Sequence, residues 1–170
     1  MKKLVLLATV TTMSFMLVAC GGDNTEKSSE SVGKEQTTTE GFTWDADGVE
    51  LSIDATKENT VDKIEEEAEY FESPSCAYDG VDKIYSYNNY SVTFYEGDGE
   101  DGISLITLTS DLVSTEEGLS VGSTKEEVLA TYGDPAKDDK NLVVYENGKT
   151  ELRFILKDDV VVSVEYAKVF

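Results

Sequence analysis

Hydrophobic and polar residues alternate through much of the C-terminal part of the chain, and this alternation predicts antiparallel strands. The apolar run 142–145 is followed by Asn147-Gly148, a strong hairpin signal because both residues tolerate positive φ. Runs 151–156 and 160–166 place apolar side chains at every second position, and a polar turn at 157–159 separates them. The pattern predicts a three-stranded antiparallel meander.

A second meander is predicted earlier in the chain. Strand-like runs cover 84–87 and 90–95, and the intervening Asn88-Asn89 favours a turn. An acidic, glycine-rich loop at 96–102 separates them from a third run at 103–109. Both parts of the chain therefore carry three consecutive strands.

A helical pattern precedes each meander. Before the second meander, Ser123 and Glu126 have the spacing of a capping box, and Gly133 followed by Pro135 is typical of a helix end. The apolar residues on one face of this helix are Val128, Leu129 and Tyr132. Before the first meander, Thr60 is a candidate cap for a helix with Val61, Ile64, Ala68 and Phe71 on one side and Glu65, Glu66, Glu67 and Glu69 mostly toward solvent.

The order of these elements indicates a tandem repeat. Leu51-Ser52-Ile53 before the first helix corresponds to Leu119-Ser120-Val121 before the second, and a proline follows each helix. We therefore predict an α+β fold of two helix-plus-antiparallel-sheet repeats with three to four strands each, at 42–113 and 114–170. Neither helix is amphipathic enough to stand alone, so each is expected to cover one face of its sheet. The two sheets could join edge to edge into one larger curved sheet.

The N-terminus has the pattern of a lipoprotein signal peptide at 1–19. Lys2 and Lys3 precede an uncharged, mostly apolar run that is shorter than the roughly 20 residues of a membrane span. The run ends in Leu17-Val18-Ala19-Cys20, which resembles a lipobox. The resemblance implies cleavage before Cys20 and a diacylglyceryl thioether on its sulfur, and two acyl chains form a stable membrane anchor. We expect the protein at the outer, extracytoplasmic face of the cell membrane.

The segment 20–41 is predicted to be a flexible tether. It is rich in Gly, Ser, Thr, Glu and Lys, and such a composition buries too little apolar surface to offset its ordering entropy. Its root-mean-square reach is roughly 25 Å. The folded part would then stand clear of the lipid headgroups.

Charge and residue types exclude several classes of function. The net charge of −21 argues against nucleic-acid binding, which requires basic surfaces. The chain contains no histidine, so Ser-His-Asp and Cys-His mechanisms and histidine-ligated metals are excluded. Cys76 has no partner once Cys20 is lipidated; it is either a small buried residue or a reactive or intermolecularly bonded thiol. Asp98-Gly99-Glu100-Asp101 offers oxygen ligands but not the EF-hand spacing, so no metal site is assigned.

Two runs carry a resemblance to known families. Residues 75–87 (SCAYDGVDKIYSY) and 114–122 (STEEGLSVG), the latter continuing to Tyr132-Gly133-Asp134-Pro135, resemble lipoproteins of Gram-positive, clostridial-type bacteria. The second run also resembles the repeat of β-lactamase-inhibitor-protein-like folds. The resemblance implies tandem helix-plus-sheet repeats whose concave sheet binds other proteins, without catalytic residues or cofactors. Fold analogy alone is a weak argument for function.

The tyrosines are the candidate binding residues. Tyr85 and Tyr87 share a strand face, and Tyr95 lies opposite the face of Val92 and Phe94. Tyrosine is enriched at protein interfaces, so these rings either close the edges of the sheet's core or line an exposed concave surface. We hypothesise a non-enzymatic, membrane-anchored protein-binding or adaptor module. A structural or assembly lipoprotein of the cell envelope is the alternative, and an enzyme without histidine chemistry is the third.

Overall fold

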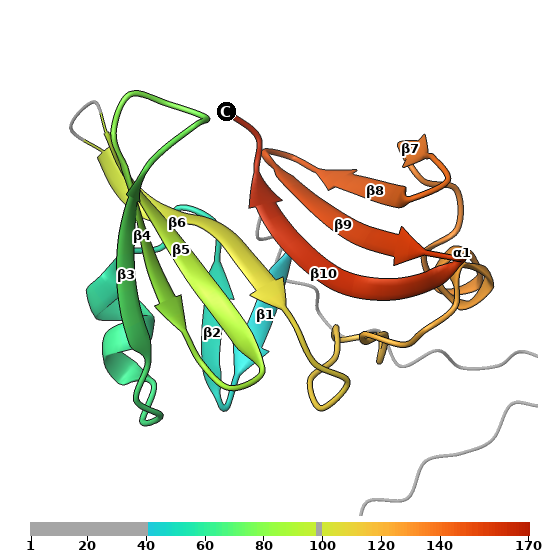
Figure 1. Ribbon diagram of the computed structural model, residues 1–170, viewed down its shortest axis with the longest axis horizontal. Coiled ribbons are helices and arrows are strands. Elements are labelled where there is room, and N and C mark those ends of the chain that lie inside the picture. The colour runs from blue at the N-terminus through green and yellow to red at the C-terminus, as the bar shows by residue number, and fades with distance from the viewer. Residues whose placement is uncertain (1–40, 98–99) are drawn as a thin grey trace, which may run out of the picture. The chain divides into compact units, whose positions relative to one another are not determined.

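The computed structural model describes residues 41–97 and 100–170, and these residues are mostly β-structure. Strands make up 49% of the structure and helices of all kinds 11%, so the predicted α+β fold of helix-plus-sheet repeats is wrong. One antiparallel sheet has the strand order β3-β4-β5-β6-β10-β9-β8-β7 (Figure 1). Its strands are β3 (Glu69–Pro74), β4 (Val81–Ser86), β5 (Tyr90–Gly97), β6 (Glu100–Leu108), β7 (Lys137–Asp138), β8 (Leu142–Asn147), β9 (Thr150–Lys157) and β10 (Val160–Lys168).

The two meanders predicted from the alternation are present as β4-β5-β6 and β8-β9-β10. They join edge to edge, because β6 pairs with β10 in an antiparallel ladder that places Leu108 opposite Val164 and Leu105 opposite Ala167. Eight strands thus share one sheet across the boundary predicted at residue 113. β6 and β10 are the last strands of the two meanders, and because they pair with each other neither is an edge of the sheet.

The predicted first helix is replaced by short turns and a strand. Two 3-10 turns, η1 (Lys57–Asn59) and η2 (Val61–Lys63), are followed by β3, which contains Tyr70 and Phe71. In a helix Glu65 and Glu69, four residues apart, would lie on one face and repel each other. Tyr70 and Phe71 have a high β-propensity and pair with β4. The prediction of a first helix was wrong because the pairing of β3 with β4 outweighed a weak helical periodicity.

The second helix forms one residue later than predicted. Helix α1 spans Lys125–Tyr132, and its capping box is Thr124 with Glu127 instead of Ser123 with Glu126. The Ser123 carbonyl instead accepts a hydrogen bond from the Val161 N–H at 2.8 Å, and the Lys125 N–H donates to the Asp159 carbonyl at 2.9 Å. These two bonds form a β-bridge between Thr124 and Val160, which holds Thr124 extended and fixes where the helix begins.

A hairpin that the sequence analysis missed precedes the main sheet. Strands β1 (Thr43–Ala46) and β2 (Val49–Ser52) join through Asp47 and Gly48, which have φ values of 52° and 90°. An Asp-Gly pair between two such runs is a strong signal for a tight hairpin. The Trp44 ring packs edge to face against Tyr90 with centroids 4.8 Å apart, and its Nε1–H donates to the Ser114 carbonyl at 2.8 Å.

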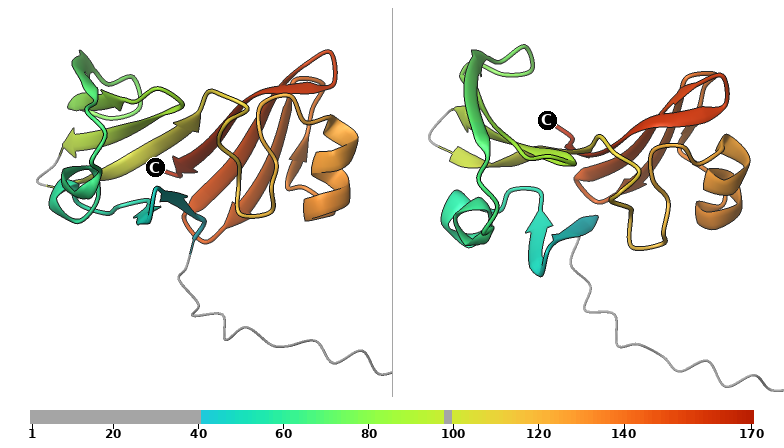
Figure 2. Two further views of the ribbon diagram at one scale, coloured as in Figure 1. Left: turned by 90° about the horizontal axis from the view of Figure 1, so that it is seen from below. Right: turned by 60° about the horizontal axis from the view of Figure 1, so that its bottom comes forward.

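One face of the eight-stranded sheet is covered and the other is open. Figures 1 and 2 show β1–β2, the 3-10 turns and α1 on the same side. Within the described residues, no helix or strand forms a second layer on the opposite side. A single hydrophobic core fills the covered side and draws on both meanders, which makes 41–170 one packed unit. Its members include Trp44, Leu51, Val92, Ile106, Leu108, Val128, Val143, Phe154, Val164 and Tyr166.

Candidate binding surface on the open face of the sheet

The open face carries an uncharged row of side chains that crosses five strands. Neighbouring strands place these residues directly opposite one another, so they share a face. Exposure varies along the row: Phe71 at the edge is 58% exposed, Ile84 and Leu105 are half-buried, and Thr93 and Ala167 are buried. From the edge inward the members are Phe71, Ile84, Thr93, Leu105 and Ala167.

A second uncharged row runs beside the first. Ser86, Ser91 and Thr107 are paired across β4, β5 and β6 and are half-buried. Beyond Thr107 the row becomes charged, because Glu165 on β10 and Arg153 on β9 follow in register. Glu69 on β3 precedes this row in register, and Asp82 on β4 also faces the open side, so the neutral surface of the first meander consists of these two rows.

The charged end of the open face is a small ion-pair cluster. Arg153 Nε lies 2.6 Å from Glu151 Oε2, and Arg153 Nη1 lies 3.9 Å from Glu165 Oε2. Burial raises the pKa of Glu165, and the Arg153 guanidinium partly offsets this shift. The single guanidinium of Arg153 therefore neutralises the carboxylates of Glu151 and Glu165 only in part.

The three tyrosines predicted as binding residues do not come together on one surface. Tyr85 is paired with Val92 on the covered side and is half-buried, with its ring edge to face against Phe94 at 5.7 Å. Tyr87 is also half-buried and stacks on Tyr90 with centroids 4.6 Å apart. Tyr95 is on the opposite side from these two and is only 6% exposed.

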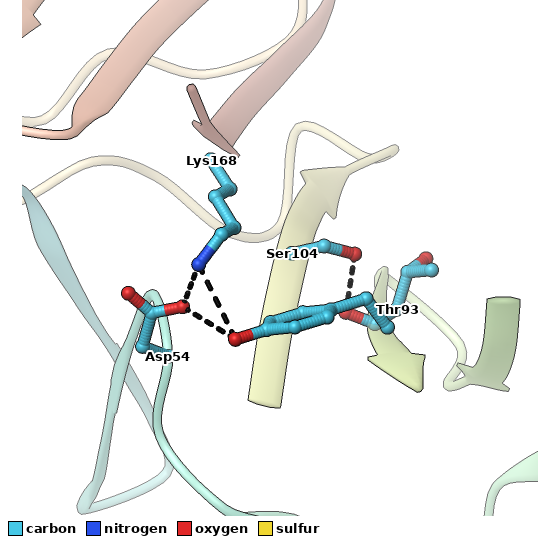
Figure 3. Close-up of polar contacts among 5 residues, drawn as sticks. Asp54, Thr93, Ser104 and Lys168 are labelled. Atoms are coloured by element: carbon cyan, nitrogen blue, oxygen red, sulfur yellow. Dashed lines mark hydrogen bonds and ion pairs between the residues drawn. The ribbon is translucent and has the colours of Figure 1, made fainter. Parts of the chain in front are cut away.

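Tyr95 is covered by a contact network that ties the C-terminus to the first meander. Its ring lies 5.9 Å from that of Tyr78 and 5.7 Å from that of Phe170. Its hydroxyl donates to Asp54 Oδ1 at 3.1 Å, and Lys168 Nζ donates to the same carboxylate and, at 3.3 Å, to the Tyr95 hydroxyl (Figure 3). Burial raises the pKa of Tyr95, so the hydroxyl keeps its proton. The side chain holds the fold together and offers a partner little surface.

Strand β3 contributes exposed aromatic surface that the sequence analysis had assigned to a helix. Tyr70 is 51% exposed and packs on Tyr85 at 5.0 Å, and its hydroxyl donates to the neighbouring Glu72. This hydrogen bond to the carboxylate raises the pKa of Tyr70 to about 12. The consecutive β-forming aromatics before Ser73-Pro74 were the available signal for a strand.

A cavity of about 350 Å³ lies between the β1–β2 turn and the segment after η2. Its lining mixes aliphatic side chains with three carboxylates and one ammonium group. Nearby charges include those of Asp47 and Glu66, which also act on the buried Tyr90 hydroxyl. Among the described atoms, that hydroxyl has no hydrogen-bond partner. The lining residues are Ala46, Asp47, Val49, Lys63, Ile64, Glu65 and Glu66.

Other candidate chemistries concern single residues. Cys76 is exposed, so it is not the buried residue that composition alone favoured. In the part of the chain that the structure describes, no group of three acidic or cysteine residues is arranged to hold a metal. Over the same residues, no helix is long and apolar enough to cross a membrane. Cys20, and residues 98 and 99 of the acidic loop, lie outside the described residues.

No protein-family model, no curated protein and no solved structure matches the chain. The sheet and its surface are therefore the basis for assigning a function.

Proposed function

We propose that this protein is a non-enzymatic protein-binding module, held at the extracytoplasmic face of the cell membrane by lipid on Cys20. The observation that carries the proposal is the uncharged row on the open face, from Phe71 to Leu105. The chain has 35 acidic residues against 14 basic ones, so a strip that crosses several strands without a charge is unlike the rest of its composition.

Leaving the apolar members of this row in water costs free energy. Aliphatic and aromatic side chains gain roughly 25 cal/mol for each Å² removed from water, and the strip begins at a strongly exposed phenylalanine. Interface cores are depleted of charge and enriched in aromatic residues, whereas charged residues gather at the rim. The open face has this arrangement, with the Arg153 cluster beside the neutral rows.

The test is photo-crosslinking of the native lipoprotein in intact cells. A photoreactive phenylalanine analogue is placed at position 71, and a matched control carries it at Leu112, which is 79% exposed in the loop after β6. We expect position 71 to capture a discrete protein and position 112 to capture none. Cys20→Ala should reduce the capture by about tenfold, because the module loses its position at the membrane.

Three results would count against this proposal or change it. Equal capture at both positions would show that the open face has no special role. No capture at either position would remove the protein-binding function. Capture of envelope-assembly machinery that persists through purification would favour the structural and assembly function over an adaptor.

A further inference from the structure

Strand β3 is the long free edge of the eight-stranded sheet. It has six residues and, among the residues that the structure describes, pairs only with β4, whereas the opposite edge strand β7 has two residues. Very short edge strands are one of the ways in which proteins avoid unwanted pairing. The β7 edge is blunted in this way, but β3 offers enough backbone for another strand.

The register identifies which backbone groups of β3 are free. Bonded and non-bonded residue pairs alternate in an antiparallel ladder, and the Ser75 N–H donates to the Gly80 carbonyl at 3.0 Å just beyond the strand. Counting back in steps of two, Phe71 bonds toward β4. The N–H and C=O groups of Tyr70 and Glu72 therefore point away from the sheet. Pro74 falls in the same outward set, where a proline removes no ladder hydrogen bond.

The charge along this edge is negative and poorly compensated. Glu69 and Glu72 lie in β3 and are exposed, and Glu65 to Glu67 lie just before it. The cross-strand neighbour of Glu72 is Lys83, but that ammonium group is paired with Glu96. Glu72 accepts a hydrogen bond from the Tyr70 hydroxyl, which carries no charge to neutralise it.

We propose that β3 accepts an extended cationic segment of a partner protein as a ninth strand, an inference that rests on the proposed function and names its mode of binding. The incoming backbone pairs with Tyr70 and Glu72. Partner residues opposite these two lie on the same face as the Glu72 carboxylate and the Tyr70 ring, where a lysine or arginine is favoured. The partner residue opposite Phe71 lies on the open face and extends its uncharged row, so an apolar residue is favoured there.

The negative charge of β3 favours a cationic partner over a second copy of the chain. Two β3 strands paired with each other would bring Glu69 and Glu72 of both copies to one seam, with no basic residue in either strand. Like charges close together in a ladder are destabilising, and each copy also carries a net charge of −21. Strand addition gives affinity through the backbone and selectivity through alternate side chains.

The inference is tested with an acetylated and amidated octapeptide of alternating lysine and valine. Two control peptides are a block peptide of four lysines followed by four valines, and an alternating glutamate–valine peptide. We expect the alternating lysine peptide to bind at least tenfold more tightly than either control. In amide-resolved hydrogen exchange, the Tyr70 and Glu72 N–H groups should slow at least fivefold when this peptide binds, because both groups gain acceptors.

Two substitutions at position 72 distinguish the contribution of the backbone N–H to binding from that of the carboxylate charge. Glu72→Pro removes an outward N–H without touching the β3–β4 ladder, and it should weaken binding at least tenfold. Glu72→Gln keeps the N–H and removes the charge, and it should weaken binding about fivefold. Glu126→Gln makes the same charge change at an exposed site on α1 and should leave binding unchanged.

The outcomes distinguish this inference from the proposed function. Equal affinity for the block and alternating peptides, or unchanged Tyr70 and Glu72 exchange, would show non-specific adsorption and overturn the ninth-strand mode. Self-association lost in Glu72→Pro, measured by sedimentation, would assign the edge to a second copy and overturn it as well. If position 71 still captures a partner in cells while Glu72→Pro has no effect, the binding function stands and the strand-addition mode fails.

Discussion

Glu165 is a half-buried acid in a chain whose other acids are mostly solvated. Its carboxylate lies on the open face of β10, 3.9 Å from the guanidinium of Arg153, which also pairs more closely with Glu151. Because burial is the larger influence, the pKa of Glu165 is raised above its ordinary value of about 4.3. The folded state therefore holds a proton on the Glu165 carboxyl group more tightly than the unfolded chain does.

This shift fixes the sign of a pH effect on stability. The contribution of Glu165 is most favourable below about pH 4.3 and is lost as the pH rises through its raised folded-state pKa. We expect Glu165→Gln to raise the melting temperature at pH 7 by about 2 °C and to reduce the loss of stability just above pH 4.3. Glu146→Gln, an exposed site on β8, serves as the control in the same calorimetric pH series. A lower melting temperature for Glu165→Gln at pH 7 would mean that the Arg153 pairing outweighs burial.

At the scale of elements, turns and caps act where the backbone permits only a few conformations. The β9–β10 hairpin turns through Asp158 and Asp159, both with positive φ, as the sequence pattern predicted. The β8–β9 hairpin is also present, but its turn is shifted by one residue: Asn147 pairs with Thr150, and Gly148 has a φ of 61°. The ladder register thus chooses between neighbouring residues that could each serve a turn.

The cap of α1 is formed by Thr124 and Glu127. The Glu127 N–H donates to Thr124 Oγ1 at 3.2 Å, and Glu127 Oε2 accepts from the Thr124 N–H at 2.7 Å. We expect Thr124→Ala to lower the free energy of unfolding by about 1 kcal/mol, measured by urea denaturation. Ser123→Ala should cost less, because Ser123 Oγ only accepts from the Ser120 N–H in the preceding turn. The opposite ranking would restore Ser123 as the cap.

The whole molecule depends on the seam between the two meanders. β6 and β10 pair across it, and Leu108, Val164 and Tyr166 pack into the core that both meanders share. The contact network of Asp54, Tyr95 and Lys168 adds a second tie between the first meander and the end of β10. A continuous sheet and a common core predict that the halves unfold together.

A core variant at the seam tests this cooperativity. Leu108 is fully buried, and we expect Leu108→Ala to lower the free energy of unfolding by about 3 kcal/mol because it leaves a cavity. Amide exchange through global unfolding should then accelerate to the same extent in β5 and in β9. Leu112→Ala, at an exposed site nearby, should change neither strand. Acceleration confined to β5 would show that the two meanders unfold separately.

The candidate binding surface could be predicted only in part from the sequence. The alternation correctly placed Tyr95 on the sheet face opposite to that of Phe94. It could not show that Phe170 and Tyr78, which are distant in the sequence, would cover the Tyr95 ring. Phe71 was assigned to a helix, so the edge strand that carries it was missed. The open face depends on long-range pairing of β3 through β10, which no local pattern encodes.

The sequence by itself determined the strands of both meanders, the turns between them to within one residue, the second of the two predicted helices with its glycine stop, and a strongly acidic chain without histidine. These features depend on residues close together in the chain, through side-chain alternation, backbone preference and composition. Tertiary structure decided that residues 69–74 form an edge strand, that α1 begins at Lys125, and that one sheet face stays open. Each of these depends on pairing or burial between distant segments, which outweighs local propensities of a fraction of a kcal/mol for each residue.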